Sequence, residues 1–138
     1  MRKKVLLLAM FVGLLLSAIA LTLAPIHVPS PLDKICHFAG FSALTAFAIL
    51  TFDSFFGENS INPFILLTFV FGGFFAAIFE FAQNFVPKRS CDVNDLIVNL
   101  LGIAFICVAS FLFYSGKKVV KSLQNRPTVT VDIKLAHE

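Results

Sequence analysis

Four long apolar segments alternate with short polar segments along the chain. The apolar segments cover residues 5–24, 35–52, 63–85 and 96–114. A helix needs about 20 apolar residues to cross about 30 Å of hydrocarbon, and a spanning backbone must satisfy its own hydrogen bonds, which favours helices over open strands. The pattern therefore predicts an all-α membrane protein, a bundle of four transmembrane helices with short loops, within residues 1–115.

Turn and capping residues mark where the later helices begin. Ser30 before Pro31 predicts an N-cap followed by the first helical residue, and Asn62 before Pro63 repeats that arrangement. Asp92 begins a similar signal ahead of the last apolar segment. These signals predict that the connections between the helices are short.

The composition strengthens the assignment to a membrane. The chain has 138 residues, of which 58% are hydrophobic and 14% are charged, whereas ordinary soluble domains are about 45–50% apolar and about 25% charged. A soluble chain of this length cannot bury so much apolar surface, so lipid must cover part of it. Because there is no basic helix face and no known motif, we expect no nucleic-acid partner.

The distribution of basic residues predicts the orientation. Lys and Arg precede the first span and follow the last one, at Arg2, Lys3, Lys4, Lys117, Lys118, Lys121 and Arg126. The positive-inside rule then places both termini on the cytoplasmic side of the membrane, with residues 25–34 and 86–95 outside. The second connection supports this orientation least, because it has Asp53 and Glu58 but no Lys or Arg.

The two ends of the chain carry separate expectations. The first apolar run is about twice as long as the 7–15 residues of a signal-peptide core, which favours a retained helix over a cleaved leader. Residues 116–138 begin with basic residues and are expected to form a loosely ordered cytoplasmic tail near anionic lipid. The segment TVTVDIKL alternates as a strand does, but one isolated strand is marginally stable.

Strongly polar residues gather at the predicted outer ends of the last three helices. They are Asp33, Lys34, His37, Glu80, Gln83, Arg89, Asp92, Asp95 and Asn99. Residues three or four apart share a helix face, as Asp33 and His37 do on one helix and Asp95 and Asn99 do on another. The spacing therefore predicts that three polar faces meet in a ligand-binding site at the extracytoplasmic membrane surface.

Most of these residues also have a structural explanation, because acids cap helices and cations extend toward headgroups. Glu80 is the hardest to explain in this way. A charged acid inside a membrane costs at least a few kcal/mol, so Glu80 needs a cation, a proton or a water-filled pocket. The available partners in the sequence are Arg89, Lys34 and His37.

The ordered pattern of polar residues resembles the VanZ-like family of small bacterial membrane proteins over residues 30–105. The pattern is Asp33-Lys34-x-x-His37 followed by Glu80-x-x-Gln83-x-Phe85-x-Pro87-x-Arg89-x-x-Asp92-x-x-Asp95-x-x-x-Asn99-x-x-Gly102. The resemblance implies a role at the cell-envelope surface, because the founding member is associated with low-level resistance to teicoplanin, a glycopeptide that binds peptidoglycan precursors. It implies no established reaction.

Recognition of an anionic lipid or a lipid-linked envelope precursor is the first of three functions considered. Lys34, Lys88 and Arg89 would hold a phosphate, and the neighbouring acids would position those cations. An oligomeric transporter is a further alternative, but the inner halves of spans two to four are largely apolar. The oligomeric state cannot be predicted from these residues.

A membrane enzyme that acts on a lipid headgroup is the remaining function. Its candidate acid–base residues are His37, Glu80 and Asp95, and a carboxylate set of Glu80, Asp92 and Asp95 would suit Mg²⁺. Since the chain has no known hydrolase or metalloenzyme motif, no catalytic residue is assigned and no metal or cofactor is expected.

The three cysteines, Cys36, Cys91 and Cys107, lack CxxC spacing. Cys36 and Cys91 are both expected on the outer side, where a disulfide is feasible if their geometry allows it. Two free thiols are favoured over that pairing, and a metal site that combines these cysteines with His37 is favoured least.

Overall fold

The computed structural model describes residues 2–25, 28–57, 61–87 and 89–125. These residues contain four helices, namely α1 (Arg2–Leu23), α2 (Leu32–Phe56), α3 (Ile61–Gln83) and α4 (Val93–Gln124). Each helix is long and apolar enough to cross a membrane by length and composition. The predicted all-α bundle of four membrane helices is confirmed, and the side on which the termini lie stays a prediction.

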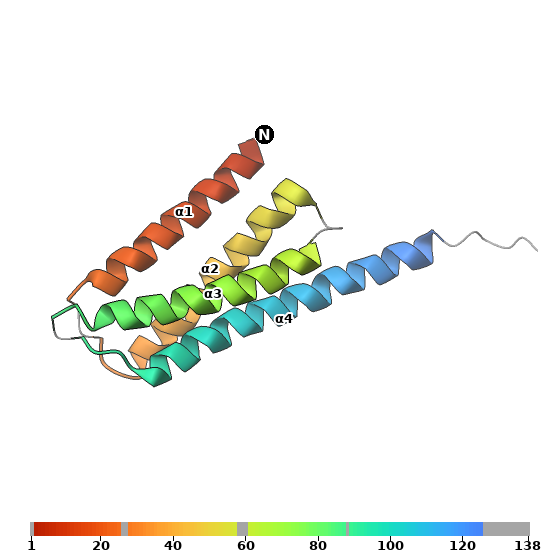
Figure 1. The fold of residues 1–138 in the computed structure, drawn as a ribbon. Helices are drawn as coiled ribbons and strands as arrows, with labels where there is room; N and C mark the ends of the chain where they lie inside the picture. The colour runs from red at the N-terminus through yellow and green to blue at the C-terminus, as the bar shows by residue number, and fades with distance from the viewer. Residues whose placement is uncertain (1, 26–27, 58–60, 88, 126–138) are drawn as a thin grey trace, which may run out of the picture.

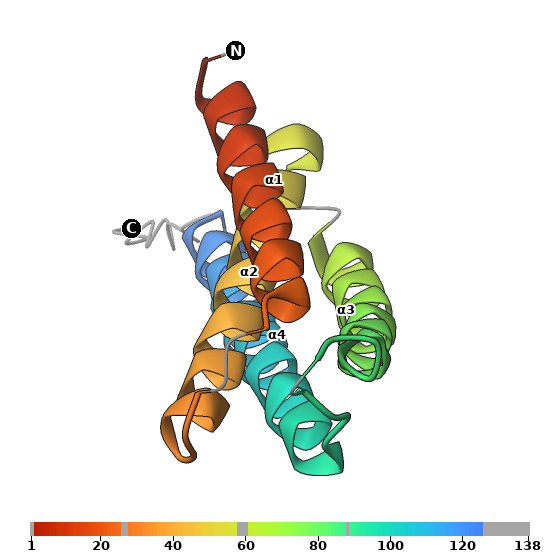
Figure 2. The same cartoon turned by 90° about the vertical axis from the view of Figure 1, so that its left-hand side faces the viewer.

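Helices α2, α3 and α4 pack closely, whereas α1 is attached more loosely. Helix α2 makes its most extensive contact with α4, and α3 packs against both. Helix α1 contacts α2 and α3 but has no fully buried residue. Its N-terminal part lies apart from α3 and α4 (Figure 1) but stays beside α2, where Lys4 Nζ is 5.4 Å from the centre of the Phe55 ring. The end of the molecule that faces the viewer in Figure 2 holds the α1–α2 and α3–α4 connections.

Two of the predicted N-caps are wrong. Helix α2 begins at Leu32 with Pro31 in the N-cap position and no side-chain cap, so Ser30 is not the cap. Helix α3 begins at Ile61, and Asn62 therefore lies inside its first turn. Ile61 is fully buried, so packing against the bundle sets the start of this helix in place of the capping signal.

Helix α4 extends beyond the predicted span and corrects the expectation of a loose tail from residue 116. The helix continues to Gln124, and its 32 residues correspond to about 48 Å, more than the hydrocarbon thickness of about 30 Å. Its C-terminal turns project past the other helices (Figure 1), and Lys117 Nζ lies 4.7 Å from the centre of the Phe113 ring. Residues 126–138, with the alternating segment TVTVDIKL, lie outside the described residues.

Helices α2 and α4 approach each other closely at Gly102. A Cβ atom at Gly102 would lie 2.7 Å from the Phe38 carbonyl oxygen and 2.9 Å from Ser42 Oγ. The Ser42 hydroxyl donates a hydrogen bond of 3.3 Å to the Gly102 carbonyl oxygen. Small residues allow membrane helices to come this close, so Gly102 sets the distance between the two helices.

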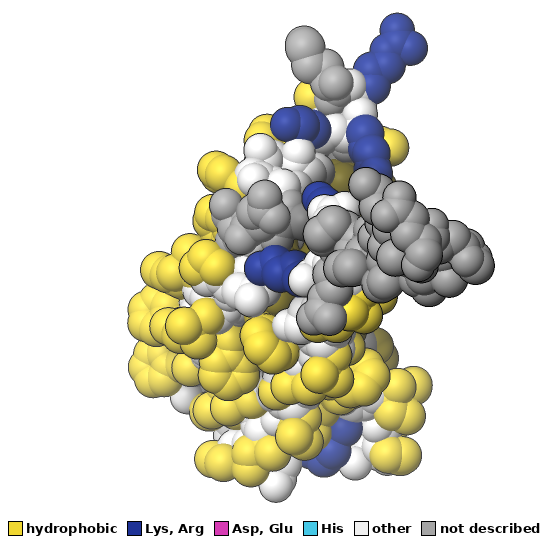
Figure 3. All heavy atoms as spheres, turned by 90° about the vertical axis from the view of Figure 1, so that its right-hand side faces the viewer, with side chains coloured by type: hydrophobic (Ala, Val, Ile, Leu, Met, Phe, Trp, Pro, Cys, Tyr) yellow, Lys and Arg dark blue, Asp and Glu magenta, His cyan; other side chains and the backbone are white. Residues whose placement is uncertain are grey.

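Small residues on α3 also face the bundle. Ala76 is fully buried, and a Cβ atom at Gly72 would meet the Ile103 side chain of α4 at 3.4 Å. Large hydrophobic side chains are exposed on all four helices, and Figure 3 shows them over much of one face, with Lys and Arg in its upper part. The outer surface is therefore suited to hydrocarbon.

Replacing Gly102 by Ala is expected to lower the free energy of unfolding by about 1–3 kcal/mol, because the added methyl group forces α2 and α4 apart. The measurement is unfolding of purified protein in mixed micelles with increasing SDS. Gly116→Ala on the same helix is the matched control, since nothing lies within 4 Å of its added Cβ. Equal unfolding midpoints for the two variants would contradict the close contact.

Candidate functional site

The polar residues predicted to form a site do lie at one end of the bundle. The first turns of α2 carry Asp33, Lys34 and His37, the last turns of α3 carry Glu80 and Gln83, and α4 with its N-cap carries Asp92, Asp95 and Asn99. Four of them, Glu80, Gln83, Asp95 and Asn99, are buried. Contacts link α2 to α4 and α3 to the N-cap of α4, so the three polar faces meet.

Lys34 joins α2 to the beginning of α4. Its Nζ donates a hydrogen bond of 2.8 Å to Asp95 Oδ1 and lies 3.6 Å from Asp92 Oδ2. The Asp95 side chain is buried, whereas the Lys34 side chain is about one-third exposed. Because Lys34 is held by two carboxylates of its own chain, it contributes to the position of α4 and is a weaker candidate for holding an external phosphate.

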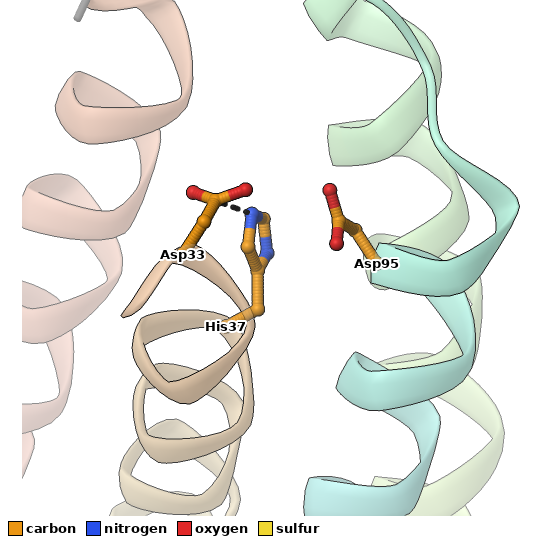
Figure 4. Close-up of side chains that lie close together, drawn as sticks. All are labelled: Asp33, His37 and Asp95. Carbon is orange, nitrogen blue, oxygen red and sulfur yellow. Dashed lines mark ion pairs between the residues drawn. The ribbon is translucent and has the colours of Figure 1, made fainter. Parts of the chain in front are cut away.

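His37 lies between Asp33 on its own helix and Asn99 on α4. Its Nδ1 is 3.0 Å from Asn99 Oδ1, and its Nε2 is 3.8 Å from Asp33 Oδ1. With Asn99 Oδ1 as the acceptor, the tautomer that fits this contact carries its proton on Nδ1, and Nε2 then faces the Asp33 carboxylate. Figure 4 shows the Asp33 and His37 side chains projecting from α2 toward Asp95 on α4.

Glu80 is the most deeply buried acid of this cluster, with 1% of its surface exposed. Its Oε1 accepts a hydrogen bond of 2.7 Å from the backbone N–H of Asp92, whereas its Oε2 is buried without a hydrogen-bond partner among the described residues. The sequence suggested a cationic side chain as the partner. The hydrogen bond instead comes from a backbone group, which no pattern of side chains reveals.

Asp92 is confirmed as the N-cap of α4. Its Oδ1 accepts hydrogen bonds of 2.9 Å from both the backbone N–H and the side-chain amide of Asn94. The backbone hydrogen bond from Asn94, with further help from Lys34, lowers the pKa of the Asp92 carboxyl below its ordinary value. Asp92 therefore caps α4 while its own N–H is held by Glu80.

The α3–α4 connection is ordered by its own hydrogen bonds. Asn84 Oδ1 accepts from the backbone N–H of Cys91 at 2.9 Å, and the Arg89 N–H donates to the Val86 carbonyl oxygen at 3.1 Å. Cys91 and Cys36 are both exposed and free, in agreement with the favoured expectation. Lys88, a predicted phosphate ligand, lies outside the described residues.

An open cavity of about 190 Å³ adjoins the polar cluster and is lined by α1, α2 and α3, with Val28 of the α1–α2 connection and Arg89 of the α3–α4 connection. Its polar lining comes from Thr22, Asp33, His37 and Arg89. The remaining lining consists of small or apolar residues, which are Ala18, Leu21, Val28, Cys36, Gly40, Phe41, Leu44 and Phe79. The sequence did not predict this cavity, because the α1 residues that form one wall, Thr22 among them, follow no pattern that indicates a site.

A second cavity, of about 230 Å³, continues along the same three helices toward the middle of the bundle. It shares Phe41, Leu44 and Phe79 with the first cavity, and its other lining residues are almost entirely apolar. The two cavities thus adjoin and present a polar end followed by a hydrocarbon-lined interior. This is the arrangement that an amphipathic molecule requires.

One group of side chains has the chemistry to hold a metal ion. Single ligand atoms of Asp33, His37 and Asp95 all lie within 4.8 Å of one another. This set differs from the carboxylate set of Glu80, Asp92 and Asp95 that the sequence offered for Mg²⁺. A nitrogen with two carboxylate oxygens suits divalent ions such as Zn²⁺ or Mn²⁺.

Comparison with known proteins places this geometry in a family. The model of the VanZ/LLP1 family matches residues 3–114, which includes the first span as well as the polar cluster. An uncharacterised protein of the fission yeast Schizosaccharomyces pombe is 34% identical over 138 residues, and the match covers 97% of this chain and 81% of that protein. No solved structure gave a match.

Replacing Glu80 by Ala is expected to lower the free energy of unfolding by about 1–3 kcal/mol, because the partly buried N–H of Asp92 then loses its acceptor. Glu80→Gln retains an oxygen acceptor and is the matched variant, with an expected loss below that of Glu80→Ala. The measurement is SDS-induced unfolding in micelles. An alanine variant as stable as the wild-type protein would show that this hydrogen bond contributes nothing.

The lowered pKa of Asp92 predicts a pH dependence of stability. The ionised cap stabilises the native state above the unfolded pKa, which is near 3.8, and this contribution disappears as the pH falls through the lower native pKa. Thermal unfolding in detergent between pH 7 and pH 2 should therefore show an acid-induced loss that is smaller in Asp92→Asn, which still caps the helix. Identical pH profiles would contradict this assignment.

Proposed function

The chain belongs to the VanZ/LLP1 family, and we propose that it binds a lipid with a phosphate-bearing headgroup at the polar end of the bundle. The observation that carries this proposal is the pair of adjoining cavities between α1, α2 and α3, polar at one end and apolar beyond it. The headgroup would lie beside Asp33, His37 and Arg89, and the hydrocarbon chain would extend along Phe41 and Leu44.

The headgroup part of the proposal depends on Arg89. Arg89 lines the first cavity together with Asp33 and His37, and a guanidinium group forms two parallel hydrogen bonds with a phosphate. Lys34 is already held by Asp95 and Asp92, so its contribution is to keep the acids of α4 in place. Asp33 and His37 would contact hydroxyl or amine groups of the same headgroup.

The hydrocarbon part of the proposal depends on the loose attachment of α1. Because α1 contributes one wall of both cavities and its inward side chains are only partly buried, separating it from α2 and α3 exposes less apolar surface than separating the three packed helices from one another would. A lipid chain can therefore enter from the bilayer, between α1 and the packed helices. In the cavity, the hydrocarbon chain exchanges its apolar contacts with other lipids for apolar contacts with the protein.

Two classes of lipid share this chemistry, a membrane phospholipid and a lipid-linked precursor of the cell envelope. Both carry a phosphate next to a hydrocarbon chain, and the polar end would face the extracytoplasmic side on the orientation that the basic residues predict. Binding of an envelope precursor would also provide a route to glycopeptide resistance of the kind associated with the founding member. The experiment below separates the two sources.

Acid–base catalysis on the bound headgroup is a second candidate function. The observation that favours it is the orientation of His37, whose Nε2 is directed toward Asp33 by the hydrogen bond at Nδ1. Transport receives less support, because the hydroxyls of Thr45 and Thr68 donate to carbonyl oxygens of their own helices and offer no polar path. Release of phosphate from a bound lipid would distinguish catalysis from binding alone.

Gly40→Leu is expected to weaken lipid binding about tenfold or more, a loss of about 1.4 kcal/mol per factor of ten. Gly40 lines the first cavity, and nothing lies within 4 Å of an added Cβ, so a leucine fills the cavity without a clash at that atom. The measurement is lipid binding to the purified chain by native mass spectrometry, with phosphatidylglycerol, phosphatidylcholine and undecaprenyl phosphate as separate probes. Arg89→Ala should weaken binding of the two anionic probes most.

Gly116→Leu is the control for Gly40→Leu, since Gly116 lies away from both cavities and also has open space around its Cβ position. Retention of undecaprenyl phosphate over phosphatidylglycerol would indicate a precursor, and the reverse order would indicate a phospholipid. Equal lipid binding by the wild-type, Gly40→Leu and Arg89→Ala proteins would refute the proposed site.

A further inference from the structure

We propose that Asp33, His37 and Asp95 bind one divalent metal ion of the Mn²⁺ or Zn²⁺ type at the polar end of the bundle. Their ligand atoms come from two helices and lie within 4.8 Å of one another (Figure 4). Metal ligands of these types sit about 2.0–2.2 Å from the ion, so small side-chain rotations bring all three onto a shared centre. The contact of α2 with α4 at Gly102 holds the two halves of the site together.

The orientation of His37 is the first reason to place a cation here. In the tautomer with the proton on Nδ1, which Asn99 Oδ1 accepts, a lone pair remains on Nε2, and Nε2 lies 3.8 Å from Asp33 Oδ1. A lone pair that faces a carboxylate is unfavourable unless a cation lies between them. Histidines that bind metals usually donate their other ring N–H to an oxygen in this way, which fixes the tautomer.

Glu80 provides an independent observation. Its side chain is 1% exposed, and its Oε2 has no hydrogen-bond partner among the described residues. A buried carboxylate oxygen without a partner is costly, and an ion bound by the adjacent residues, or a water on that ion, would supply the missing partner.

The charge of the cluster leads to the same conclusion. Four acids lie at this end, Asp33, Glu80, Asp92 and Asp95, whereas the bases in the same stretches are Lys34, Lys88 and Arg89. A phosphate would therefore approach a site with more negative than positive groups. One divalent cation makes the net charge of this end positive and provides a centre to which a phosphate oxygen binds directly. This part of the inference rests on the proposed function.

A protonated His37 is the competing source of positive charge. In that case Nε2 would donate to Asp33, but their separation of 3.8 Å exceeds the length of a hydrogen bond. Asn99 Nδ2 also stays buried without a partner among the described residues. A protonated His37 would form an ion pair with Asp33, but it leaves Glu80 Oε2 without a partner among the described residues, whereas a water on an ion held by Asp33, His37 and Asp95 would donate to it.

The test is a titration of the purified full-length chain with Mn²⁺ in detergent, after chelator treatment and without added lipid. Electron paramagnetic resonance measures the free Mn²⁺ signal, and one ion per chain is expected to bind. Asp33→Asn, His37→Gln and Asp95→Asn should each weaken binding about tenfold or more, and Asn99→Ala should weaken it about 10–100-fold through the orientation of His37.

Asp92→Asn is the matched control, because it removes a carboxylate from the same end, retains an N-cap and is expected to leave Mn²⁺ affinity within about twofold. Asp95→Asn also removes the contact with Lys34. If that variant loses helical structure for this reason, Asp33→Asn is the variant that decides the question. Absence of Mn²⁺ binding to the wild-type chain, or equal affinities of Asp33→Asn and Asp92→Asn, would overturn the proposal.

A second titration separates this inference from the proposed function. Undecaprenyl phosphate is added with and without Mn²⁺, and lipid retention is measured by native mass spectrometry. Metal binding without lipid binding would support the metal site and refute the lipid site. Lipid binding that a chelator leaves unchanged, in a chain that does not bind Mn²⁺, would refute the metal site and support the lipid site.

Discussion

The hydrogen bond from the backbone N–H of Asp92 to the Glu80 carboxylate is the interaction on which the rest of the polar end depends. It joins the last turn of α3 to the N-cap of α4 and thereby places Asp92 where its side chain caps α4 and faces Lys34. Lys34 of α2 also binds Asp95, which lies three residues after Asp92 in the first turn of α4. Each of these acids needs such a partner, because a charged acid without one is costly in the hydrocarbon of a membrane.

The close contact at Gly102 determines which faces of α2 and α4 meet. Gly102 lies one turn beyond Asn99 on α4, and its neighbour Phe38 directly follows His37 on α2. The backbone contact thus brings His37 and Asn99 within hydrogen-bond distance. The chemistry of His37 is therefore a consequence of helix packing, and a residue without a side chain contributes as much to the site as any polar group.

The four spans and the gathering of polar residues could be predicted from the sequence, because hydropathy and helical spacing are local properties. The pairing of Asp33 with His37 and the cap at Asp92 followed from the same local rules. Other features depend on tertiary structure. Packing of Ile61 displaced the cap predicted at Asn62, and the acceptor site on Glu80 is filled by a backbone donor that has no signature in the sequence.

Helix α1 forms one wall of the cavities beside the polar cluster, and these cavities indicate a function that the cluster alone does not. If the polar residues served only to join three helices, α1 would have no reason to enclose a cavity beside them. Instead, α1 forms a wall of two adjoining cavities while it buries none of its residues. A helix with no fully buried residue suits the lateral entrance that the proposed function requires, from the bilayer to the carboxylates and His37. The fold joins a polar cluster on α2, α3 and α4 to an apolar wall on α1, the combination that recognition of a membrane lipid requires.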